Sequence, residues 1–585
     1  HHTGPMLVLA GPGSGKTTVI VARVRYLIEE RKIPPQRILV ITFTRAAADE
    51  MKQRFLAQST QTGVQFGTFH SIFFRILRQS YGYTLDDVLS ETQKHQILRQ
   101  ILAQQQIQAQ DEEEYIRQFV SQLSLMQNEL ESTISFQPEG LPKDEFVAMV
   151  QAYEAAKAQM QKIDFDDMLT QCYALLSQNE KVRQYWQERF SYILVDEFQD
   201  INQAQYACLQ ILAAPNQNLF VVGDDDQSIY GFRGARPDFM LDFPKDFPNT
   251  KTVILDVNFR STGRIIRLAE RAIAGNTSRY QKNIQGNRDI GAKVHVFTAE
   301  DSTDEAELIA SKIAALLESG MSGEEIAILY RTNVQGGAFA RALYRRGIAY
   351  HLREGGMDVY THWIAKDLEA YLFLAENEES DSAFLRICNK PKRYISKEAL
   401  AQAETMPYSL LRSLEVLPTL QRWQAERLSN LRQDLAQIRR RAPHEALRYV
   451  RNVVGYDEYL AEYAAYRKAS LPNMMEIANE ITETAKGTKD SAELHQRLEE
   501  MSTQMQTQQS GQKKKTPHAV TLSTFHGAKG LEFSAVFLPS LVEGVLPHER
   551  SRTGSALEEE RRLFYVGLTR TKDSLFLSVI RSRYD

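Results

Sequence analysis

A glycine-rich turn between an apolar strand and a helix constrains this chain more than any other feature. The segment reads Leu7-Val-Leu-Ala-Gly-Pro-Gly-Ser-Gly-Lys16-Thr17-Thr18. Glycines allow successive backbone N–H groups to converge on phosphate oxygens, and the start of the following helix adds a positive dipole. The strict pattern has glycine where this chain has Ala10. The strand–turn–helix context nevertheless predicts a phosphate-binding loop, whose residues are Gly11, Gly13, Ser14, Gly15, Lys16, Thr17 and Thr18.

Two residue types in this loop suggest specific chemistry. Lys16 is expected to reach the β- and γ-phosphates of a nucleotide, and Thr17 to offer its hydroxyl to Mg²⁺. A second apolar strand, Tyr192-Ile-Leu-Val195, ends in Asp196-Glu197. Strands of a parallel sheet place their chemistry at their carboxyl ends. We therefore expect Asp196 to hold Mg²⁺ and Glu197 to act as general base toward the attacking water. Alone, this acidic pair is equally well interpreted as a solvated turn, but beside the loop it predicts a nucleoside triphosphatase.

Length and composition are compatible with such an enzyme. The chain has 585 residues, which suggests several domains, about four by length alone. Its formal net charge of −4 gives no overall basic signature, so any nucleic-acid groove must be local. Three cysteines lie far apart without metal-ligand spacing, which favours reduced, buried thiols in a cytoplasmic protein. Apolar runs are strand-sized and no signal segment is visible, so we expect no membrane association. Because residue 1 is His, we expect the natural start to be missing.

Apolar strands alternate with helical patterns, which predicts an α/β fold with parallel sheets covered on both faces. The first predicted set is Met6–Ala10, Ile38–Thr44, Val64–Thr68, Tyr192–Val195, Leu219–Gly223 and Thr252–Leu255. The second predicted set is Lys293–Thr298, Ile326–Tyr330, Val520–Ser523, Ala535–Leu538 and Leu575–Val579. Two long stretches with helical periodicity, 76–160 and 377–517, are interpreted as insertions. The polar segment Met501–Lys515 predicts a mobile linker, and its Lys513–Lys515 run is better interpreted as a solvated loop than as a phosphate contact.

Seven motifs in order carry a family resemblance. They are Ala10-Gly-Pro-Gly-Ser-Gly-Lys-Thr17, Gly67-Thr-Phe-His-Ser71, Val195-Asp-Glu-Phe-Gln-Asp200, Gly223-Asp-Asp-Asp-Gln-Ser-Ile-Tyr-Gly-Phe-Arg-Gly-Ala235, Asn258-Phe-Arg-Ser-Thr262, Thr524-Phe-His-Gly-Ala-Lys-Gly-Leu-Glu-Phe533 and Glu558-Glu-Glu-Arg-Arg-Leu-Phe-Tyr-Val-Gly-Leu-Thr-Arg570. Together they resemble the motifs of superfamily 1 DNA helicases of the UvrD/Rep/PcrA type, over essentially the whole chain.

The resemblance implies two RecA-like P-loop αβα motor domains, each interrupted by a helical insertion. The expected limits are 1–75 with 161–255 for the first motor domain, 76–160 for its insertion, 256–376 with 518–585 for the second motor domain, and 377–517 for its insertion. It also implies ATP and Mg²⁺ as cofactors, and 3′-to-5′ movement on single-stranded DNA or at its junctions with duplex.

Several site residues follow only from the resemblance. Arg260 and Arg570 match guanidinium groups that contact the γ-phosphate and speed its transfer. Gln227 resembles a γ-phosphate sensor, Glu532 a ribose contact, and Phe259 an aromatic face for adenine, where relatives commonly carry Tyr.

The resemblance also implies a DNA grip. Tyr230 and Phe232 lie just beyond Gln227 and would stack on bases, with Phe232 at a position that is usually Trp. Phe43, Thr44, His70 and His526 resemble further DNA contacts, although a single His is more often structural.

Departures from the family pattern limit what can be transferred. Arg45-Ala46 stands where relatives commonly have Asn-Lys, and the second insertion is shorter than usual. Three alternatives to a DNA-repair, replication or recombination helicase stay open: a motor that strips proteins from single strands with little unwinding, the motor part of a helicase–nuclease, and a scaffold without ATPase activity. The last is disfavoured because all the expected catalytic residues are present.

Overall fold

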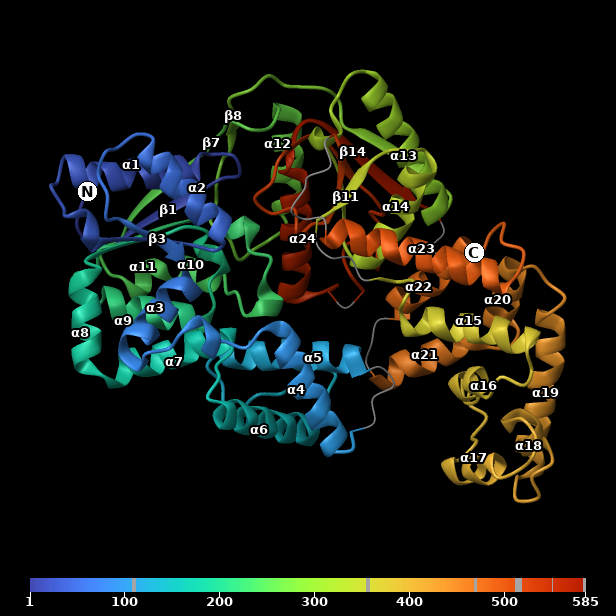
Figure 1. The fold of residues 1–585 in the computed structure, drawn as a ribbon. Helices are drawn as coiled ribbons and strands as arrows, with labels where there is room; N and C mark the ends of the chain where they lie inside the picture. The colour runs from blue at the N-terminus through green and yellow to red at the C-terminus, as the bar shows by residue number, and fades with distance from the viewer. Residues whose placement is uncertain (108–111, 354–357, 468–470, 511–517, 550, 582–585) are drawn as a thin grey trace. The chain divides into compact units, whose positions relative to one another are not determined.

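The structure, a computed structural model, describes residues 1–585 except 108–111, 354–357, 468–470, 511–517, 550 and 582–585 (Figure 1). The chain divides into two compact units. The first unit contains His1–Val296, Ala528–Val536 and Val545–Leu577, and the second contains Phe297–Gly527, Phe537–Gly544 and Ser578–Asp585. The limits of the motor domains and insertions given above stay predictions.

The first unit contains a six-stranded sheet with the order β3-β2-β4-β5-β1-β6. Its strands are β1 (Met6–Ala10), β2 (Ile38–Thr42), β3 (Gln65–Thr68), β4 (Tyr192–Val195), β5 (Leu219–Gly223) and β6 (Lys251–Leu255). All neighbouring strands pair in parallel. The central strands are buried on both faces, which explains why they are continuous apolar runs in the sequence.

The two faces of β1 show how helices cover this sheet. Leu7 and Leu9 pack in a core that includes residues of α3 (Phe69–Tyr81), α7 (Phe165–Gln178), α8 (Glu180–Arg189) and α9 (Gln203–Ala213). Val8 and Ala10 pack in a separate core with α1 (Lys16–Glu29) and α2 (Arg45–Leu56). Alternate residues of a strand point to opposite faces, so this division gives a three-layered αβα arrangement. Two short helices, α10 (Asp238–Leu241) and α11 (Phe243–Asp246), follow β5.

Residues 76–160 are helical, as expected, and contain no strand among their described residues. The helices α4 (Glu91–Gln104), α5 (Glu112–Asn128) and α6 (Lys143–Met160) lie together in Figure 1. They share a core of their own, in which Phe119, Phe146 and Tyr153 are fully buried. The first unit also contains β7 (Val257–Asn258), β8 (Gln285–Gly286), α12 (Gly263–Ile273) and α24 (Gly554–Leu568).

A second six-stranded sheet has the order β11-β12-β10-β13-β14-β9. Its strands are β9 (His295–Ala299), β10 (Ile326–Tyr330), β11 (Tyr350–Leu352), β12 (Val520–Thr524), β13 (Phe533–Leu538) and β14 (Thr571–Ile580). β12 pairs in parallel with both β10 and β11. The helices α13 (Ser302–Glu318), α14 (Gly336–Arg345) and α15 (Trp363–Glu376) belong to the second unit. The two sheets confirm the predicted α/β fold class.

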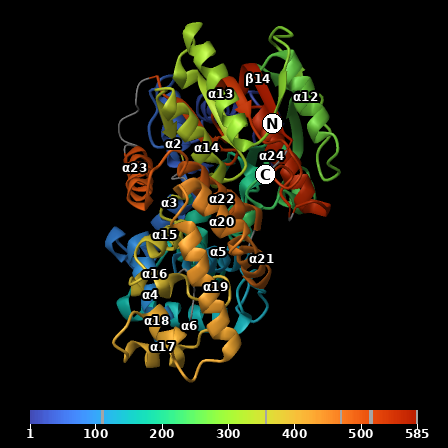
Figure 2. The same ribbon diagram turned by 90° about the vertical axis from the view of Figure 1, so that its right-hand side faces the viewer.

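The expected second insertion, 377–517, contains helices and no strand among its described residues, and Figure 2 shows its helices α16 to α19 grouped together. Its helices are α16 (Asp381–Ile387), α17 (Lys397–Glu404), α18 (Leu410–Glu415), α19 (Arg422–Ile438), α20 (Pro443–Asn452), α21 (Tyr456–Arg467), α22 (Leu471–Thr484) and α23 (Ser491–Ser510).

The predicted linker Met501–Lys515 is wrong in its first part, because α23 continues to Ser510. This part contains neither Gly nor Pro, whereas Gln and Met are good helix formers. The Lys513–Lys515 run lies outside the described residues. Within the described chain, no helix has both the length and the apolar character needed to cross a membrane. Cys172, Cys208 and Cys388 are unpaired and buried, as predicted.

Candidate nucleotide and DNA site

The glycine-rich loop after β1 packs closely on the segment around β7. Gly13 and Gly15 have φ values of +64° and +85°, a backbone conformation that favours glycine. A Cβ at Gly13 would lie 2.7 Å from the Cβ of Arg260. The Phe259 N–H donates to the carbonyl of Gly13 (3.1 Å), and the Asn258 amide donates to that of Pro12 (2.7 Å). The first unit therefore brings Arg260 and Phe259 next to the loop.

Lys16, at the start of α1, contacts Glu197, which follows β4. The Nζ of Lys16 lies 3.1 Å from each carboxylate oxygen of Glu197, and the Gln199 amide donates to Glu197 at 2.6 Å. Burial alone would raise the pKa of Glu197, but the charges of Lys16 and Lys529 outweigh it and lower that pKa to about 2. Glu197 is therefore a carboxylate at neutral pH, and a nucleotide phosphate would compete with it for Lys16.

Asp196 has the surroundings of a cation ligand. Asp196 is 5% exposed, and its Oδ1 is buried without a hydrogen-bond partner among the described residues. Burial, followed by the charge of Glu197, raises the pKa of Asp196 to about 7. A buried carboxylate oxygen without a donor fits a hard divalent cation such as Mg²⁺. Thr17, the predicted hydroxyl ligand of Mg²⁺, lies in the first turn of α1.

Arg570 contacts the predicted sensor residue directly. Its Nη2 donates to the Oε1 of Gln227 at 3.1 Å, and its Nε donates to the carbonyl of Val566 at 3.0 Å. Arg570 is 2% exposed. Burial, together with the charge of Arg260, lowers the pKa of Arg570 to about 9. Arg570 is therefore still a cation at neutral pH, held in the interior beside Gln227.

Arg260 is held by Glu532 rather than exposed to solvent. Its Nε donates to Glu532 at 2.7 Å, and its Nη1 donates to the carbonyl of Thr569 at 3.2 Å. Glu532 also lies 2.8 Å from the Nζ of Lys572. Burial would raise the pKa of Glu532, but these two cations lower it. Phe259, in contrast, is 57% exposed.

A row of aromatic side chains follows the Gln227 turn. Phe43 and Tyr230 stack with ring centroids 5.4 Å apart, and the Tyr230 and Phe232 centroids are 6.0 Å apart. The Arg233 guanidinium lies 5.3 Å from both the Tyr230 and the Phe232 ring. Phe232 is 52% exposed. Exposed rings beside a cation are typical of surfaces that bind single-stranded nucleic acid.

Lys529 connects this row to the Gln227 turn. Its Nζ donates to the carbonyl of Gln227 at 2.6 Å and lies 5.2 Å from the centroid of the Tyr230 ring. The same ammonium forms an ion pair with Asp200. Sequence reasoning did not select Lys529, although it lies inside the quoted segment Thr524–Phe533.

The three remaining DNA-contact candidates have different local roles. Thr44 caps α2, its hydroxyl accepting from the Ala47 N–H at 3.2 Å. His70 lies in the first turn of α3 with its ring 5.7 Å from that of Phe165, and burial lowers the pKa of His70. His526 follows β12 in the second unit, whereas the other candidates belong to the first.

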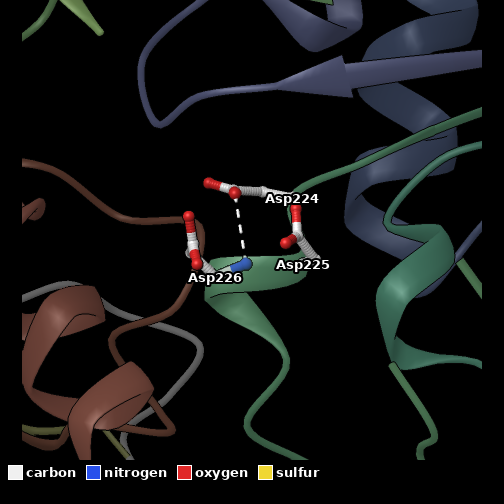
Figure 3. A group of neighbouring side chains, drawn as sticks. All are labelled: Asp224, Asp225 and Asp226. Carbon is white, nitrogen blue, oxygen red and sulfur yellow. Dashed lines mark hydrogen bonds between the residues drawn. The ribbon is translucent and has the colours of Figure 1, made fainter. Parts of the chain in front are cut away.

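Three consecutive carboxylates precede the Gln227 side chain. Figure 3 shows Asp224, Asp225 and Asp226 around a short 3₁₀ turn, where the Asp226 N–H donates to Asp224 Oδ1 at 3.3 Å. Their ligand oxygens lie within 4.8 Å of one another, and all three residues are buried. The cations of Lys282 and Arg279 pair with them. Sequence reasoning missed both cations, because the segment that carries them matches none of the quoted motifs.

The parallel sheet, the glycine-rich loop after β1 and the acidic pair after β4 define a P-loop nucleotide-binding fold. Comparison with known protein families gives two matches, which together cover nearly the whole chain. Residues 1–248 match the UvrD/REP helicase N-terminal domain, and residues 253–582 match the UvrD-like helicase C-terminal domain. The chain belongs to the UvrD/REP helicase family.

Similar individual proteins agree with this assignment. The ATP-dependent DNA helicase PcrA of Bacillus subtilis (strain 168) is 34% identical over 605 residues, which cover 99% of this chain and 81% of PcrA. The ATP-dependent DNA helicase Rep of Escherichia coli (strain K12) is 33% identical over 604 residues, which cover 99% of this chain and 89% of Rep. A Bacillus subtilis (strain 168) protein, YjcD, is 35% identical over 608 residues, which cover 99% of this chain and 77% of YjcD.

Proposed function

We propose that this UvrD/REP-family chain is an ATP-driven motor that moves 3′ to 5′ along single-stranded DNA and unwinds adjoining duplex. Membership of the family supports ATP and DNA as ligands, since the similar PcrA and Rep are ATP-dependent DNA helicases. The direction, and a preference for single-strand/duplex junctions, come from the motif resemblance alone. Three buried, unpaired cysteines suit a cytoplasmic location, which is part of the proposal.

In this proposal, each residue of the nucleotide site has a defined role. Lys16 leaves Glu197 and binds the β- and γ-phosphates, while the loop N–H groups bind the remaining phosphate oxygens. Thr17 and Asp196 hold Mg²⁺, which when bound neutralises charge on the phosphate oxygens. Glu197, freed from Lys16, accepts the proton of the attacking water.

Groups outside the glycine-rich loop and the acidic pair complete the proposed site. Arg260 exchanges Glu532 for the γ-phosphate, and Arg570 stabilises the charge that develops as this phosphate is transferred. Phe259 offers its exposed ring to the adenine base. Glu532, once released from Arg260, contacts the ribose.

One set of contacts around Gln227 supports the proposal that ATP hydrolysis is coupled to DNA binding. Gln227 accepts from Arg570 at 3.1 Å, and its own carbonyl accepts from Lys529, whose ammonium lies 5.2 Å from the Tyr230 ring. A γ-phosphate contact at Gln227 and a base stacked on Tyr230 or Phe232 would therefore act on one short loop. Phe43, Thr44, His70 and His526 are proposed as the further DNA contacts.

The test measures ATP hydrolysis with and without single-stranded DNA, then unwinding of duplexes with either a 3′ or a 5′ single-stranded tail. We expect hydrolysis to rise when single-stranded DNA is added, and unwinding only of 3′-tailed duplexes. Unwinding of 5′-tailed duplexes would contradict the direction. Stimulated hydrolysis that displaces a protein bound to single-stranded DNA, without strand separation, would favour the protein-stripping alternative.

A further inference from the structure

The three carboxylates after β5 enclose a cation that belongs to the protein itself. Lys282 places its Nζ 2.6 Å from Asp224 Oδ1, 2.5 Å from Asp225 Oδ1 and 2.9 Å from Asp226 Oδ2. The side chain of Lys282 is 1% exposed, and those of the three carboxylates are 0% exposed. The ammonium therefore occupies the position between three carboxylates that are close enough together to hold a metal ion.

A second set of donors satisfies the outer oxygens of the cluster. Arg279 donates from Nε and Nη2 to the two oxygens of Asp226, both at 2.7 Å, and the Tyr280 N–H donates to Asp225 Oδ2 at 2.7 Å. Buried carboxylates are tolerated only when they are paired and hydrogen-bonded in this way. With two cations facing three carboxylates, the cluster keeps a net charge of about −1.

Lys282 stays charged in this position. Burial alone would lower the pKa of Lys282, but the carboxylates of Asp224, Asp225 and Asp226 outweigh burial and raise it. The ammonium is therefore a permanent cation at neutral pH, and the segment around residue 282 is tied to the turn that ends in Gln227.

Asp224 differs from its two neighbours because it also binds the side chain of Gln227. Its Oδ1 accepts from Lys282, and its Oδ2 accepts from the Gln227 amide nitrogen at 2.6 Å. A carboxylate can only accept hydrogen bonds, so it selects the NH₂ end of the amide. The carbonyl end of Gln227 is thereby turned toward Arg570, from which it accepts at 3.1 Å.

We propose that Lys282 and Asp224 are positioning residues, which keep the Gln227 side chain in the orientation that presents its carbonyl oxygen to Arg570. Lys282 holds the Asp224 carboxylate in place, and Asp224 fixes the amide of Gln227. Neither residue contacts the reacting phosphate. The inference rests on the proposed function, in which Gln227 and Arg570 act on the γ-phosphate.

Asp224→Asn and Asp225→Asn form a matched pair for the test. Each substitution removes one buried carboxylate charge from the same turn, and each removed carboxylate is a partner of Lys282. Only Asp224, however, binds Gln227. An asparagine at 224 can turn its own NH₂ toward Gln227, so the amide of Gln227 loses its fixed orientation. We expect Asp224→Asn to lower the kcat of DNA-stimulated ATP hydrolysis by about tenfold or more, with KM for ATP changed less than about threefold. Asp225→Asn should keep kcat within about threefold, although both variants melt at lower temperature than the wild type.

A second pair separates positioning from charge balance. Lys282→Met removes one cation and should lower both kcat and the melting temperature, and adding Asp225→Asn restores the net charge of the cluster. We expect the double variant to regain much of the lost melting temperature while its kcat stays low, because Asp224 still lacks its ammonium partner. Recovery of kcat in parallel with melting temperature would overturn the inference, since Lys282 would then be purely structural.

The wild type tells the two proposals apart. If it shows no DNA-stimulated ATP hydrolysis, the proposed function fails. If the wild type is stimulated by DNA but Asp224→Asn and Asp225→Asn have the same kcat, only the positioning inference fails. The comparison of Asp224→Asn with Asp225→Asn decides the role of Asp224 even if Lys282→Met does not fold.

Discussion

Glu197→Gln separates nucleotide binding from hydrolysis at the predicted catalytic carboxylate. In the structure, Glu197 holds Lys16 at 3.1 Å, so an incoming phosphate must take this lysine from it. The fall in the pKa of Glu197 from 4.5 to about 2 corresponds to roughly 3 kcal/mol in favour of the charged carboxylate. Glutamine keeps the size of the side chain but removes the charge that holds Lys16.

Two opposite effects are expected from this single substitution. Part of that free energy is released when Lys16 no longer has to leave a carboxylate, so ATP should bind as tightly as before or tighter, by about 1–2 kcal/mol or roughly 5- to 30-fold. Glutamine cannot accept the proton of the attacking water, so kcat should fall by about 10²- to 10⁴-fold.

The assay combines steady-state ATP hydrolysis in the presence of single-stranded DNA with an equilibrium titration of nucleotide under the same conditions. Gln199→Ala is a useful companion, because it removes the other donor to Glu197 and leaves the carboxylate. It should lower kcat much less than Glu197→Gln does. A loss of nucleotide affinity in Glu197→Gln that parallels the loss of rate would refute the reasoning, because Glu197 would then be a binding residue.

Four further predictions concern other residues of the first unit. Lys16→Ala should leave less than about a tenth of the wild-type ATP turnover while nucleotide-free binding to single-stranded DNA survives, and higher turnover in a kinetic assay would contradict the loop assignment. Arg570→Ala and Arg260→Ala should each lower kcat far more than nucleotide affinity, and equal losses in steady-state kinetics would identify them as structural ion-pair residues. Phe232→Ala should weaken single-strand binding by about 1–3 kcal/mol with an unchanged salt slope, whereas Phe232→Trp preserves it. Because Phe232 is 52% exposed, a melting curve of the alanine variant should stay near that of the wild type, and early melting would make Phe232 a core residue instead. Burial, partly offset by Lys529, raises the pKa of Asp200 from 3.8 to about 6, so the folded state binds this proton more tightly than the unfolded state. Asp200 thus adds stability as pH falls from 7 toward 4, and Asp200→Asn should remove that gain. Relative to the variant, the melting temperature of the wild type should therefore be higher at pH 4 than at pH 7, and an equal difference at both pH values would contradict the prediction.

The strands of the first sheet could be predicted because each is a short apolar run between turn residues. β1, β4 and β5 have the predicted limits, since parallel strands buried on both faces carry almost no polar residue. β2 ends at Thr42 rather than at the predicted Thr44, because Thr44 caps α2. β11 was missed, and at three residues it is too short to show a periodicity.

Local patterns also predicted the residues that lie at strand ends and in the glycine-rich loop. Lys16 and Glu197, for example, were selected separately, and the structure brings their charged groups to 3.1 Å. Their roles in catalysis stay predictions. What the sequence could not show is that Lys16 and Glu197 form an ion pair with each other, because the pair depends on β1 and β4 lying in one sheet.

The groups that hold the candidate site in place are harder to predict, for a physical reason. A buried charge needs a partner, but the fold can supply that partner from any distance along the chain. Arg260 pairs with Glu532 across 272 residues, and Lys282 pairs with Asp224 across 58. Neither separation leaves a local pattern. Residues that contact a ligand recur in recognisable motifs, whereas residues that position them become visible only when burial and hydrogen bonds are known. The pairing of Lys282 with Asp224, and the positioning role proposed for it, therefore became visible only in the structure.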